Sequence, residues 1–211
     1  MKKFELTNEF ITNMFGTKLF RIRALVEFGD VEAGELGGYV EKESNLGHDD
    51  NAWVYDNAWV YGNARVYGDA QVSGDARVYD NAWVYGDAQV SGDARVYDNA
   101  RVYGNAWVYG NAWVYGNAWV YGNALVCSDE DYAYAHGFGS VNRTTTFFRL
   151  KDGGVGVRCG CFYGTLAQFR DKIRETHGET KKAQEYLMLA DLMELRFEED
   201  ENEVGNRKYV E

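Results

Sequence analysis

Tryptophan, arginine and tyrosine are the side chains of this sequence whose spacing could support chemistry. Between residues 51 and 128 they recur at six-residue intervals, always at the same positions relative to alanine and valine. Aromatic rings stack on one another and guanidinium groups lie over aromatic faces, so these residues suit binding rather than bond breaking. The candidate binding residues are Trp59, Arg77, Arg95, Trp113, Tyr79, Tyr97, Arg65, Trp83, Arg101 and Trp119.

Residues that commonly act in catalysis are few and scattered. The three histidines are His48, His136 and His177, and none lies between residues 51 and 128. Cys159 and Cys161 alternate on one expected strand, where both thiols would point the same way and pack as small hydrophobes. Further ligands at zinc-site spacing are not evident. We therefore predict no catalytic residue, no cofactor and no metal site, and we lean against an enzyme.

The elements that must position the aromatic residues are thirteen consecutive six-residue units, which run from residue 51 to residue 128 without insertion. Each has the form Asn/Asp-Ala-x-Val-Tyr/Ser-Gly/Asp, with small departures in the last unit. Residues 69–86 and 87–104 are identical except at Trp83 and Arg101. A repeat of eighteen residues equals three units, so the period predicts a coil with three sides.

Within a unit, alanine and valine alternate with variable residues, which predicts a short strand with alanine and valine facing inward. The Gly/Asp and Asn/Asp positions predict corners, because these residues tolerate positive φ. Aspartates also recur eighteen residues apart, as in Asp69/Asp87, Asp75/Asp93 and Asp80/Asp98. Such pairs could hold Ca²⁺, but corner residues that face water are the simpler interpretation.

The eighteen-residue period assigns every outward residue to one of three sides. One side carries Trp53, Gln71, Gln89, Trp107 and Leu125, the second Trp59, Arg77, Arg95 and Trp113, and the third Arg65, Trp83, Arg101 and Trp119. All six tryptophans are thus expected to point away from the core. Two interpretations stay open: the columns stabilise the stack, or they form a binding surface or subunit interface.

The repeated Ala-x-Val units, with Val54, Val60, Val66 and their successors, closely resemble the hexapeptide-repeat, left-handed parallel β-helix family. The segment before them is similar to the entry segment of uncharacterised bacterial and prophage acetyltransferase-like proteins of this kind, so the resemblance covers residues 20–128. It implies a left-handed all-β solenoid and a parallel trimer. Enzymes of the family are acyltransferases, which use a catalytic histidine and an extruded loop, and carbonic anhydrases, which use three zinc-bound histidines; these features are not evident in the thirteen units.

The remaining chain is expected to form flanking parts. Residues 1–50 should be a strand-rich cap, with a strand near 20–28, a turn at 34–38, and an irregular first coil that begins at Val40 and Leu46. Residues 129–140 are expected to be a linker. Residues 141–211 should form a ββαα module, which resembles the C-terminal module of the same prophage-type proteins. Its helices should begin near Thr165 and Lys181, and its acidic tail FEEDENE should be solvated.

Composition limits the partners and the compartment. The formal net charge of the 211 residues is −11, with 22 basic and 33 acidic residues and no basic cluster. We therefore do not expect direct binding to nucleic acid or to an anionic membrane. Three cysteines do not make a disulfide framework, and no signal peptide or apolar span is evident, which favours the cytoplasm.

Two functions follow from different features of the sequence. The aromatic and arginine columns favour a non-catalytic binding protein whose partner is a protein, a glycan or a nucleotide-like ligand. The prophage resemblance extends this hypothesis to a host-modulating role, including inhibition of a defence system. The alternative, an acyl-CoA-dependent acetyltransferase of the hexapeptide type, rests on the resemblance in fold alone.

Overall fold

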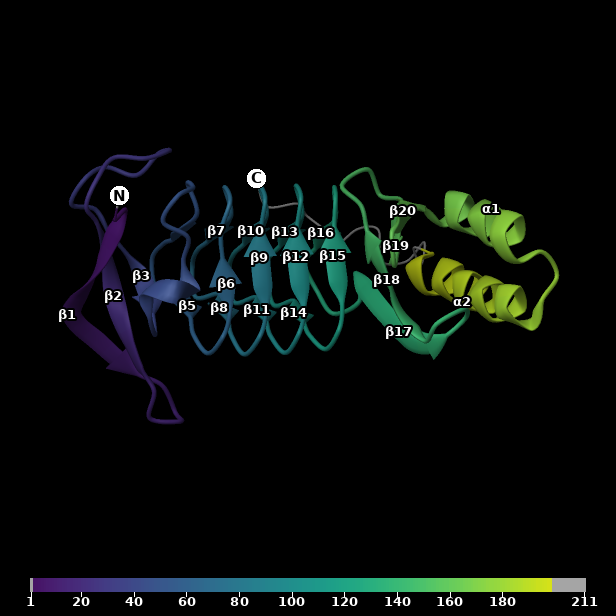
Figure 1. Cartoon of the computed structure of the whole chain (residues 1–211), viewed down its shortest axis with the longest axis horizontal. Helices are drawn as coiled ribbons and strands as arrows, with labels where there is room; N and C mark the ends of the chain where they lie inside the picture. The colour runs from purple at the N-terminus through teal and green to yellow at the C-terminus, as the bar shows by residue number, and fades with distance from the viewer. Residues whose placement is uncertain (1, 199–211) are drawn as a thin grey trace.

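The computed structural model describes residues 2–198, and the FEEDENE tail lies outside these residues from Glu199 onward. Three parts follow one another along an elongated molecule (Figure 1). An N-terminal antiparallel sheet leads into a parallel β-solenoid, and a second sheet with two helices closes the other end. The expected all-β solenoid with a C-terminal α+β part is confirmed.

Three parallel ladders form the sides of the solenoid. The first ladder is β4 (Trp53–Val54), β7 (Gln71–Val72), β10 (Gln89–Val90), β13 (Trp107–Val108) and β16 (Leu125–Val126). The second is β3 (Leu36–Val40), β5 (Trp59–Val60), β8 (Arg77–Val78), β11 (Arg95–Val96) and β14 (Trp113–Val114). The third is β6 (Arg65–Val66), β9 (Trp83–Tyr85), β12 (Arg101–Tyr103) and β15 (Trp119–Tyr121). We call these the first, second and third sides.

The register confirms three units per coil. Trp59 pairs with Arg77, and Arg77 pairs with Arg95, so each residue lies beside the one eighteen positions later. The same offset joins Arg65 to Trp83 on the third side. The assignment of outward residues to three sides is therefore confirmed.

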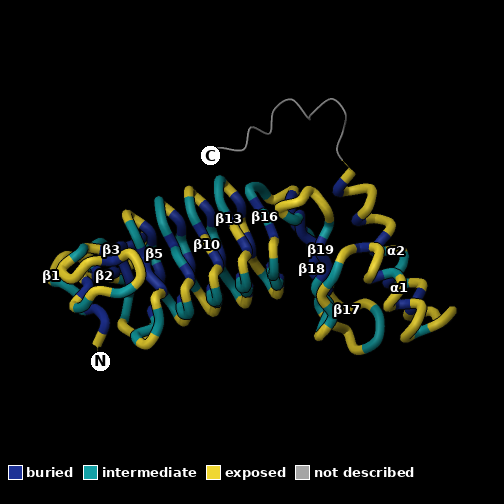
Figure 2. The backbone as a smooth tube through the Cα atoms, turned by 90° about the horizontal axis from the view of Figure 1, so that it is seen from above, coloured by how far each residue is buried: buried dark blue, intermediate teal, exposed yellow. Residues whose placement is uncertain are grey.

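Alanine and valine fill the interior of the coils, as predicted. Every such residue from Ala52 to Val126 is buried, with at most 1% of its surface exposed. Figure 2 shows the result as buried stretches that recur along each coil between exposed corners. A narrow coil of constant cross-section has one volume to fill per position, which explains why the same two residue types recur.

The corners use the positive φ that their residue types allow. Nine corner glycines have positive φ, and Asp56, Asp80 and Asp98 take the same conformation at φ 53°, 57° and 57°. Asparagines at the next position form a ladder, in which Asn63 Nδ2 donates to Asn81 Oδ1 (3.2 Å) and Asn81 Nδ2 donates to Asn99 Oδ1 (3.4 Å). The aspartate and asparagine side chains thus support the corners of the stack.

Both ends of the solenoid leave backbone groups without a neighbouring coil. Successive coils are joined by backbone hydrogen bonds, such as Trp53 N to Ala70 O (3.1 Å). An edge strand presents both N–H and C=O groups that have no such partner. Each end therefore needs a cap, because unpaired backbone groups at a sheet edge invite pairing with another chain.

Side-chain donors bind carbonyl groups at the N-terminal end. The ammonium of buried Lys3 donates to the carbonyls of Asp50 and Ala52, both at 2.8 Å, and Asn45 Nδ2 donates to the carbonyls of Gly62 (3.2 Å) and Ala64 (2.8 Å). Burial lowers the pKa of Lys3, against the partial compensation of its bond to Asp50.

The segment before the first regular unit lies along the coils, because Val40 pairs with Val60 and Leu46 bridges to Val66. The turn expected at residues 34–38 is wrong beyond Gly34, since β3 begins at Leu36. A side chain on Gly37 would lie 2.5 Å from the carbonyl oxygen of Val54, so this glycine permits close approach of two strands rather than a turn. β1 (Phe4–Thr12) and β2 (Lys18–Ala24) then extend the second ladder in antiparallel fashion.

Side-chain acceptors bind backbone N–H groups at the C-terminal end. Asp129 Oδ1 accepts from Trp113 N (2.7 Å), and Thr146 Oγ1 accepts from Trp119 N (2.9 Å). Asp131 Oδ2 accepts from Ser128 N (3.1 Å), while its Oδ1 pairs with Arg149 Nε at 3.2 Å in a buried ion pair. The C-terminal sheet is therefore joined to the last coil by polar contacts that match the exposed N–H groups.

The C-terminal part contains more strands than expected. β17 (Tyr132–Phe138), β18 (Arg143–Arg149), β19 (Val155–Cys159) and β20 (Phe162–Thr165) form one antiparallel sheet. The linker expected at residues 129–140 is thus wrong, because most of it is β17. α1 (Leu166–His177) begins after the Thr165/Gln168 capping box and ends at Gly178, and α2 (Lys181–Phe197) begins where predicted.

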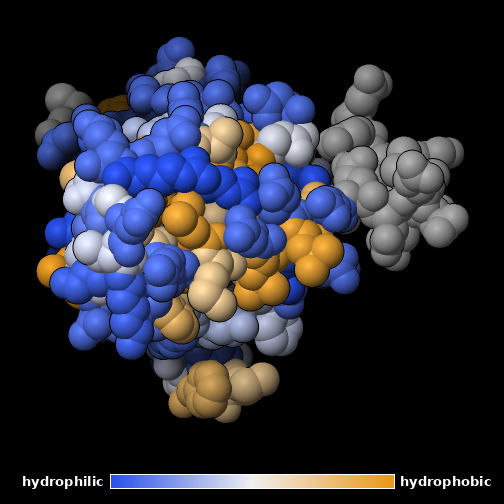
Figure 3. All heavy atoms as spheres, turned by 90° about the vertical axis from the view of Figure 1, so that its right-hand side faces the viewer, coloured by the Kyte–Doolittle hydropathy of each residue, from blue (hydrophilic) through white to orange (hydrophobic). Residues whose placement is uncertain are grey.

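The helices cover the outer face of this sheet. Phe169 and Ile173 of α1 and Tyr186 and Met193 of α2 are buried against it. The opposite stripe of α2 carries Met188, Leu192 and Leu195, all more than half exposed. Figure 3, which looks onto this end, shows hydrophobic residues grouped within a largely hydrophilic face. No described helix is long and apolar enough to cross a membrane.

Candidate functional site

The second side carries a column of four cationic and aromatic side chains, Trp59, Arg77, Arg95 and Trp113. The Arg77 guanidinium lies 4.2 Å from the Trp59 ring centre, and that of Arg95 lies 4.6 Å from the Trp113 ring centre. The two arginines are neighbours in the middle of the ladder, and the indoles lie outside them. Because the strands fix these positions, the side chains form a rigid strip across four coils.

A tyrosine column runs beside this strip. Tyr61, Tyr79, Tyr97 and Tyr115 stack in sequence with ring centres 5.0, 5.0 and 5.3 Å apart. Burial raises the pKa of Tyr61, Tyr79 and Tyr97 above its ordinary value. Trp113 and Tyr115 are 41% and 38% exposed, so the strip and the column offer aromatic surface to solvent.

The third side has a similar composition and a different setting. Arg101 lies between Trp83 and Trp119, at 4.8 and 4.9 Å from their ring centres, and Arg65 lies 5.8 Å from Trp83. Tyr67, Tyr85, Tyr103 and Tyr121 form its tyrosine column. Burial and the neighbouring tyrosines raise the pKa of Tyr85 to about 12.

The C-terminal sheet contacts the end of this third side. Arg158 Nε donates to the Tyr103 hydroxyl (3.0 Å), and the Tyr163 ring meets the Tyr121 ring edge to face at 4.6 Å. The ten predicted binding residues are therefore placed on two separate sides of the prism and do not form one site. The second-side set is Trp59, Arg77, Arg95, Trp113, Tyr79 and Tyr97, and the third-side set is Arg65, Trp83, Arg101 and Trp119.

The first side corrects one expectation. Trp53 does not display its indole, because Phe28 and Phe4 of the N-terminal part pack against it at ring distances of 5.3 and 6.2 Å and leave it 0% exposed. Trp107, three coils further along the same ladder, is 42% exposed, and Lys151 Nζ lies 3.9 Å from its ring centre. Gln71 and Gln89 occupy the positions between these two tryptophans.

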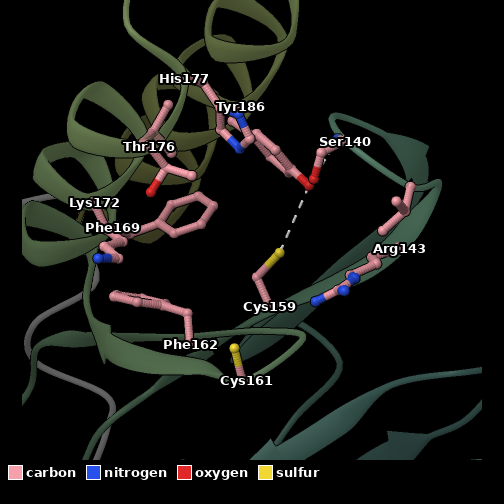
Figure 4. A pocket seen from close by; sticks show the side chains of 12 residues that line it. Ser140, Arg143, Cys159, Cys161, Phe162, Phe169, Lys172, Thr176, His177 and Tyr186 are labelled. Carbon is pink, nitrogen blue, oxygen red and sulfur yellow. Dashed lines mark hydrogen bonds between the residues drawn. The ribbon is translucent and has the colours of Figure 1, made fainter.

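A pocket of about 250 Å³ lies between the C-terminal sheet and the helices (Figure 4). Phe162, Phe169 and Tyr186 form aromatic walls, and Lys172 and Arg143 add cationic groups. The Tyr186 hydroxyl accepts from Ser140 N (3.3 Å) and lies 3.9 Å from Cys159 Sγ. Burial, with Cys159 nearby, raises the pKa of Tyr186.

The two cysteines of this pocket do not behave as a pair. Cys159 ends β19 and accepts a hydrogen bond from Thr145 Oγ1 at 3.1 Å. Gly160 has φ 59°, which reverses the chain and leaves Cys161 exposed in the turn. The expectation that both thiols share one face as buried hydrophobes is therefore wrong for Cys161.

The histidines lie far apart along the chain and each has a local contact. His48 stacks on Phe4 at 4.3 Å, and His177 lies against Tyr186 at 5.9 Å. His136 Nδ1 lies 2.9 Å from Thr144 Oγ1. Within residues 2–198 no three His, Cys, Asp or Glu side chains are arranged to hold a metal ion.

The sequence did not predict three cationic residues, of which two contact the columns and the third lines a pocket. Lys151 reaches Trp107, and Arg158 reaches Trp119 and Tyr121 at 5.4 and 5.7 Å. Arg143 lines the helix-side pocket. All three lie outside the repeats, so no periodicity marks them, and only the docking of the sheet on the last coil brings them to the solenoid.

Comparison with known proteins agrees with this architecture. A family described as the YdcK beta solenoid repeat matches at residues 58–70, 70–86, 88–101, 94–110, 100–116 and 108–122. No curated protein matches the chain. The match concerns the repeat units that build all three sides, and it names no activity. By its coils and by this similarity, the chain is a β-solenoid repeat protein.

Proposed function

We propose that this protein is a non-catalytic binding protein and that its second side receives the partner. The observation that carries the proposal is the strip Trp59–Arg77–Arg95–Trp113, in which two guanidinium groups lie between two indoles on a rigid ladder. Among the described residues no carboxylate forms an ion pair with Arg77 or Arg95, so both retain charge for a partner.

The chemistry of the strip favours a protein partner. Tryptophan, tyrosine and arginine are the residue types enriched at interface hot spots, where a few side chains supply most of the binding energy. A ladder backbone holds them in place, which lowers the entropy lost on association. The resemblance of residues 20–128 to prophage proteins makes a bacterial host protein in the cytoplasm the first partner to test, in keeping with a host-modulating role.

Affinity capture tests the strip. The double variant Trp59→Ala/Arg77→Ala should lose about 100-fold or more in partner affinity, because hot-spot truncations cost about 2 kcal/mol each. It should stay folded, because both side chains lie outside the valine and alanine core. The matched control is Gln71→Ala/Gln89→Ala on the first side, which should capture the partner as the parent does. Equal capture by the two double variants would remove the strip from the proposal.

We further propose that the protein is a homotrimer, as the family resemblance implies, and that the first side forms its interface. That side carries Gln71 and Gln89 where the second side carries arginines, and interface cores are depleted in charged residues. Its exposed Trp107 offers apolar surface.

Light scattering should therefore give three times the chain mass of 24.0 kDa. Gln71→Arg/Gln89→Arg should shift the mass to that of the monomer, since like charges would be buried together. Arg77→Gln/Arg95→Gln should leave the trimer intact. If the parent protein has the mass of a monomer, the trimer is excluded, and the proposal that the second-side strip binds a partner is unaffected.

A further inference from the structure

A second pocket, of about 390 Å³, lies where the C-terminal sheet meets the last coils of the third side. We call it the junction pocket. Its lining includes Trp119 from the solenoid and His136, Arg143, Thr144 and Arg158 from the sheet, and no acidic residue. The chain as a whole is acidic, with a net charge of −11. The junction pocket differs from it, because two arginines and a histidine line the pocket without a carboxylate.

Strand register explains why these residues meet. Thr146 pairs with Arg158 across β18 and β19, so the two side chains lie on one face of the sheet. Thr146 accepts a hydrogen bond from Trp119 N, which shows that this face is turned toward the last coil. The junction pocket is thus the space that remains between the sheet face and the end of the solenoid.

Arg158 is held in place before any ligand binds. Its Nε donates to the Tyr103 hydroxyl (3.0 Å), and its Nη1 donates to the Phe162 carbonyl (3.1 Å). The guanidinium also lies 5.4 Å from the Trp119 ring centre. The second amino group, Nη2, has no acceptor among the described residues, so its N–H groups remain for a ligand.

Arg143 approaches from the end of β18 and crosses the backbone at Gly160. A side chain on Gly160 would collide with Arg143 Nη1, so the glycine leaves the space that the guanidinium occupies. Residues 2–198 provide Arg143 with no ion-pair partner. Figure 4 shows the Arg143 side chain extending toward Cys159 at the edge of the helix-side pocket.

His136 and Thr144 add a neutral donor. Their Nδ1 and Oγ1 atoms lie 2.9 Å apart, which requires one of them to donate to the other. If Thr144 donates, His136 carries its proton on Nε2; if His136 donates, the Thr144 hydroxyl proton points elsewhere. In either tautomer the pair keeps one donor for a ligand.

We propose that the junction pocket binds the phosphate group of a small phosphate monoester. Two guanidinium groups balance the charge of a phosphate monoester, which is about −1.5 to −2 at pH 7, whereas a carboxylate would leave one of them uncompensated. Arginine is suited to this role because its planar donors match phosphate oxygens in pairs. The volume falls within the roughly 300–1,000 Å³ of small-molecule sites, so an organic group fits beside the phosphate. The proposal is independent of the second-side strip.

Calorimetric titration of the full chain with adenosine 5′-monophosphate, inorganic phosphate, adenosine and benzoate tests the chemistry. The monophosphate should bind with a Kd below about 1 mM, and adenosine should not bind. Inorganic phosphate should bind more weakly than the monophosphate. Benzoate should bind about tenfold more weakly than the monophosphate. No binding of either phosphate compound, or equal binding of adenosine, would overturn the proposal.

Variants locate the site. Arg143→Ala should weaken binding of the monophosphate by about tenfold or more, because it removes a charged, forked donor. The fold should persist, since Arg143 is an exposed side chain, and a thermal melt verifies this. Arg143 also lines the helix-side pocket, so the control is Lys172→Ala, which alters that pocket and not the junction pocket; its affinity should equal that of the parent. Equal affinity in both variants would place any bound phosphate elsewhere and overturn the proposal.

Discussion

Raising the pH from 10 toward 12 should greatly lower the stability of the solenoid. Burial raises the pKa of Tyr61, Tyr79 and Tyr97 in one tyrosine column, and the same cause raises those of Tyr67, Tyr85 and Tyr103 in the other. Tyr85, with tyrosines stacked on both sides, reaches about 12. A charge on one ring lies about 5 Å from the next ring of the stack, so successive ionisations also repel one another.

The sign follows from the order in which protons leave. The unfolded chain loses tyrosine protons near pH 10, whereas the folded chain holds them to higher pH. The stabilisation is therefore complete below pH 10 and is lost as the pH rises through the folded values. Because the rings are partly solvent-exposed, each contributes only about 0.5–1 kcal/mol, but six of them sum to several kcal/mol. Lys3 has the opposite effect, because burial lowers its pKa below the ordinary value of 10.5. Its contribution to stability therefore rises with pH, and only up to pH 10.5.

Thermal melts followed by circular dichroism at pH 9, 10, 11 and 12 measure the effect. The melting temperature should fall by about 10 °C or more over the upper two units. The double variant Tyr67→Phe/Tyr85→Phe keeps the stacked rings and removes two ionisable hydroxyls, so its melting temperature should fall less steeply. A parent curve that stays flat to pH 12, or a variant curve parallel to it, would contradict the assignment.

The repeats explain why most of the solenoid could be predicted. Ala52, Val54 and their successors face the same interior at every coil, so local alternation is enough to place them. Corner conformation at Gly62 or Asp80 also depends on one residue and its neighbours. The start of α1 depends only on Thr165 and Gln168. In each case the deciding contact is close in sequence or repeats at a fixed interval.

The errors arise where distant segments meet. Gly37 and Gly38 resemble a turn in the sequence, but they lie in β3. They are glycines because the backbone at Val54 and Ala58 approaches too closely for side chains. Cys161 leaves its expected face because Gly160 reverses the chain to form β20. The same limit applies to the candidate site. The columns could be predicted because they follow from the repeat. Arg143 and Arg158 could not, because only the docked sheet brings them to the third side.

Trp53→Ala should unfold the protein far more readily than Trp107→Ala, although both residues occupy the same position of their units on the first side. Trp53 is fully buried beneath Phe4 and Phe28, and its removal leaves a large cavity between the cap and the first coil. Such truncations of buried tryptophan cost about 3–5 kcal/mol. Trp107 is 42% exposed, and its truncation should cost about 1 kcal/mol.

Urea unfolding of the parent and both variants gives these free energies directly. Trp53→Phe is the third variant, because Trp53 Nε1 is buried without an acceptor among the described residues. Phenylalanine retains most of the apolar contact and removes that donor, so it should restore most of the stability that alanine loses. Equal losses for Trp53→Ala and Trp107→Ala would mean that the N-terminal strands do not cover the first coil in solution. The N-terminal end of the ladders would then be open, with the carbonyls that Lys3 now binds exposed to water.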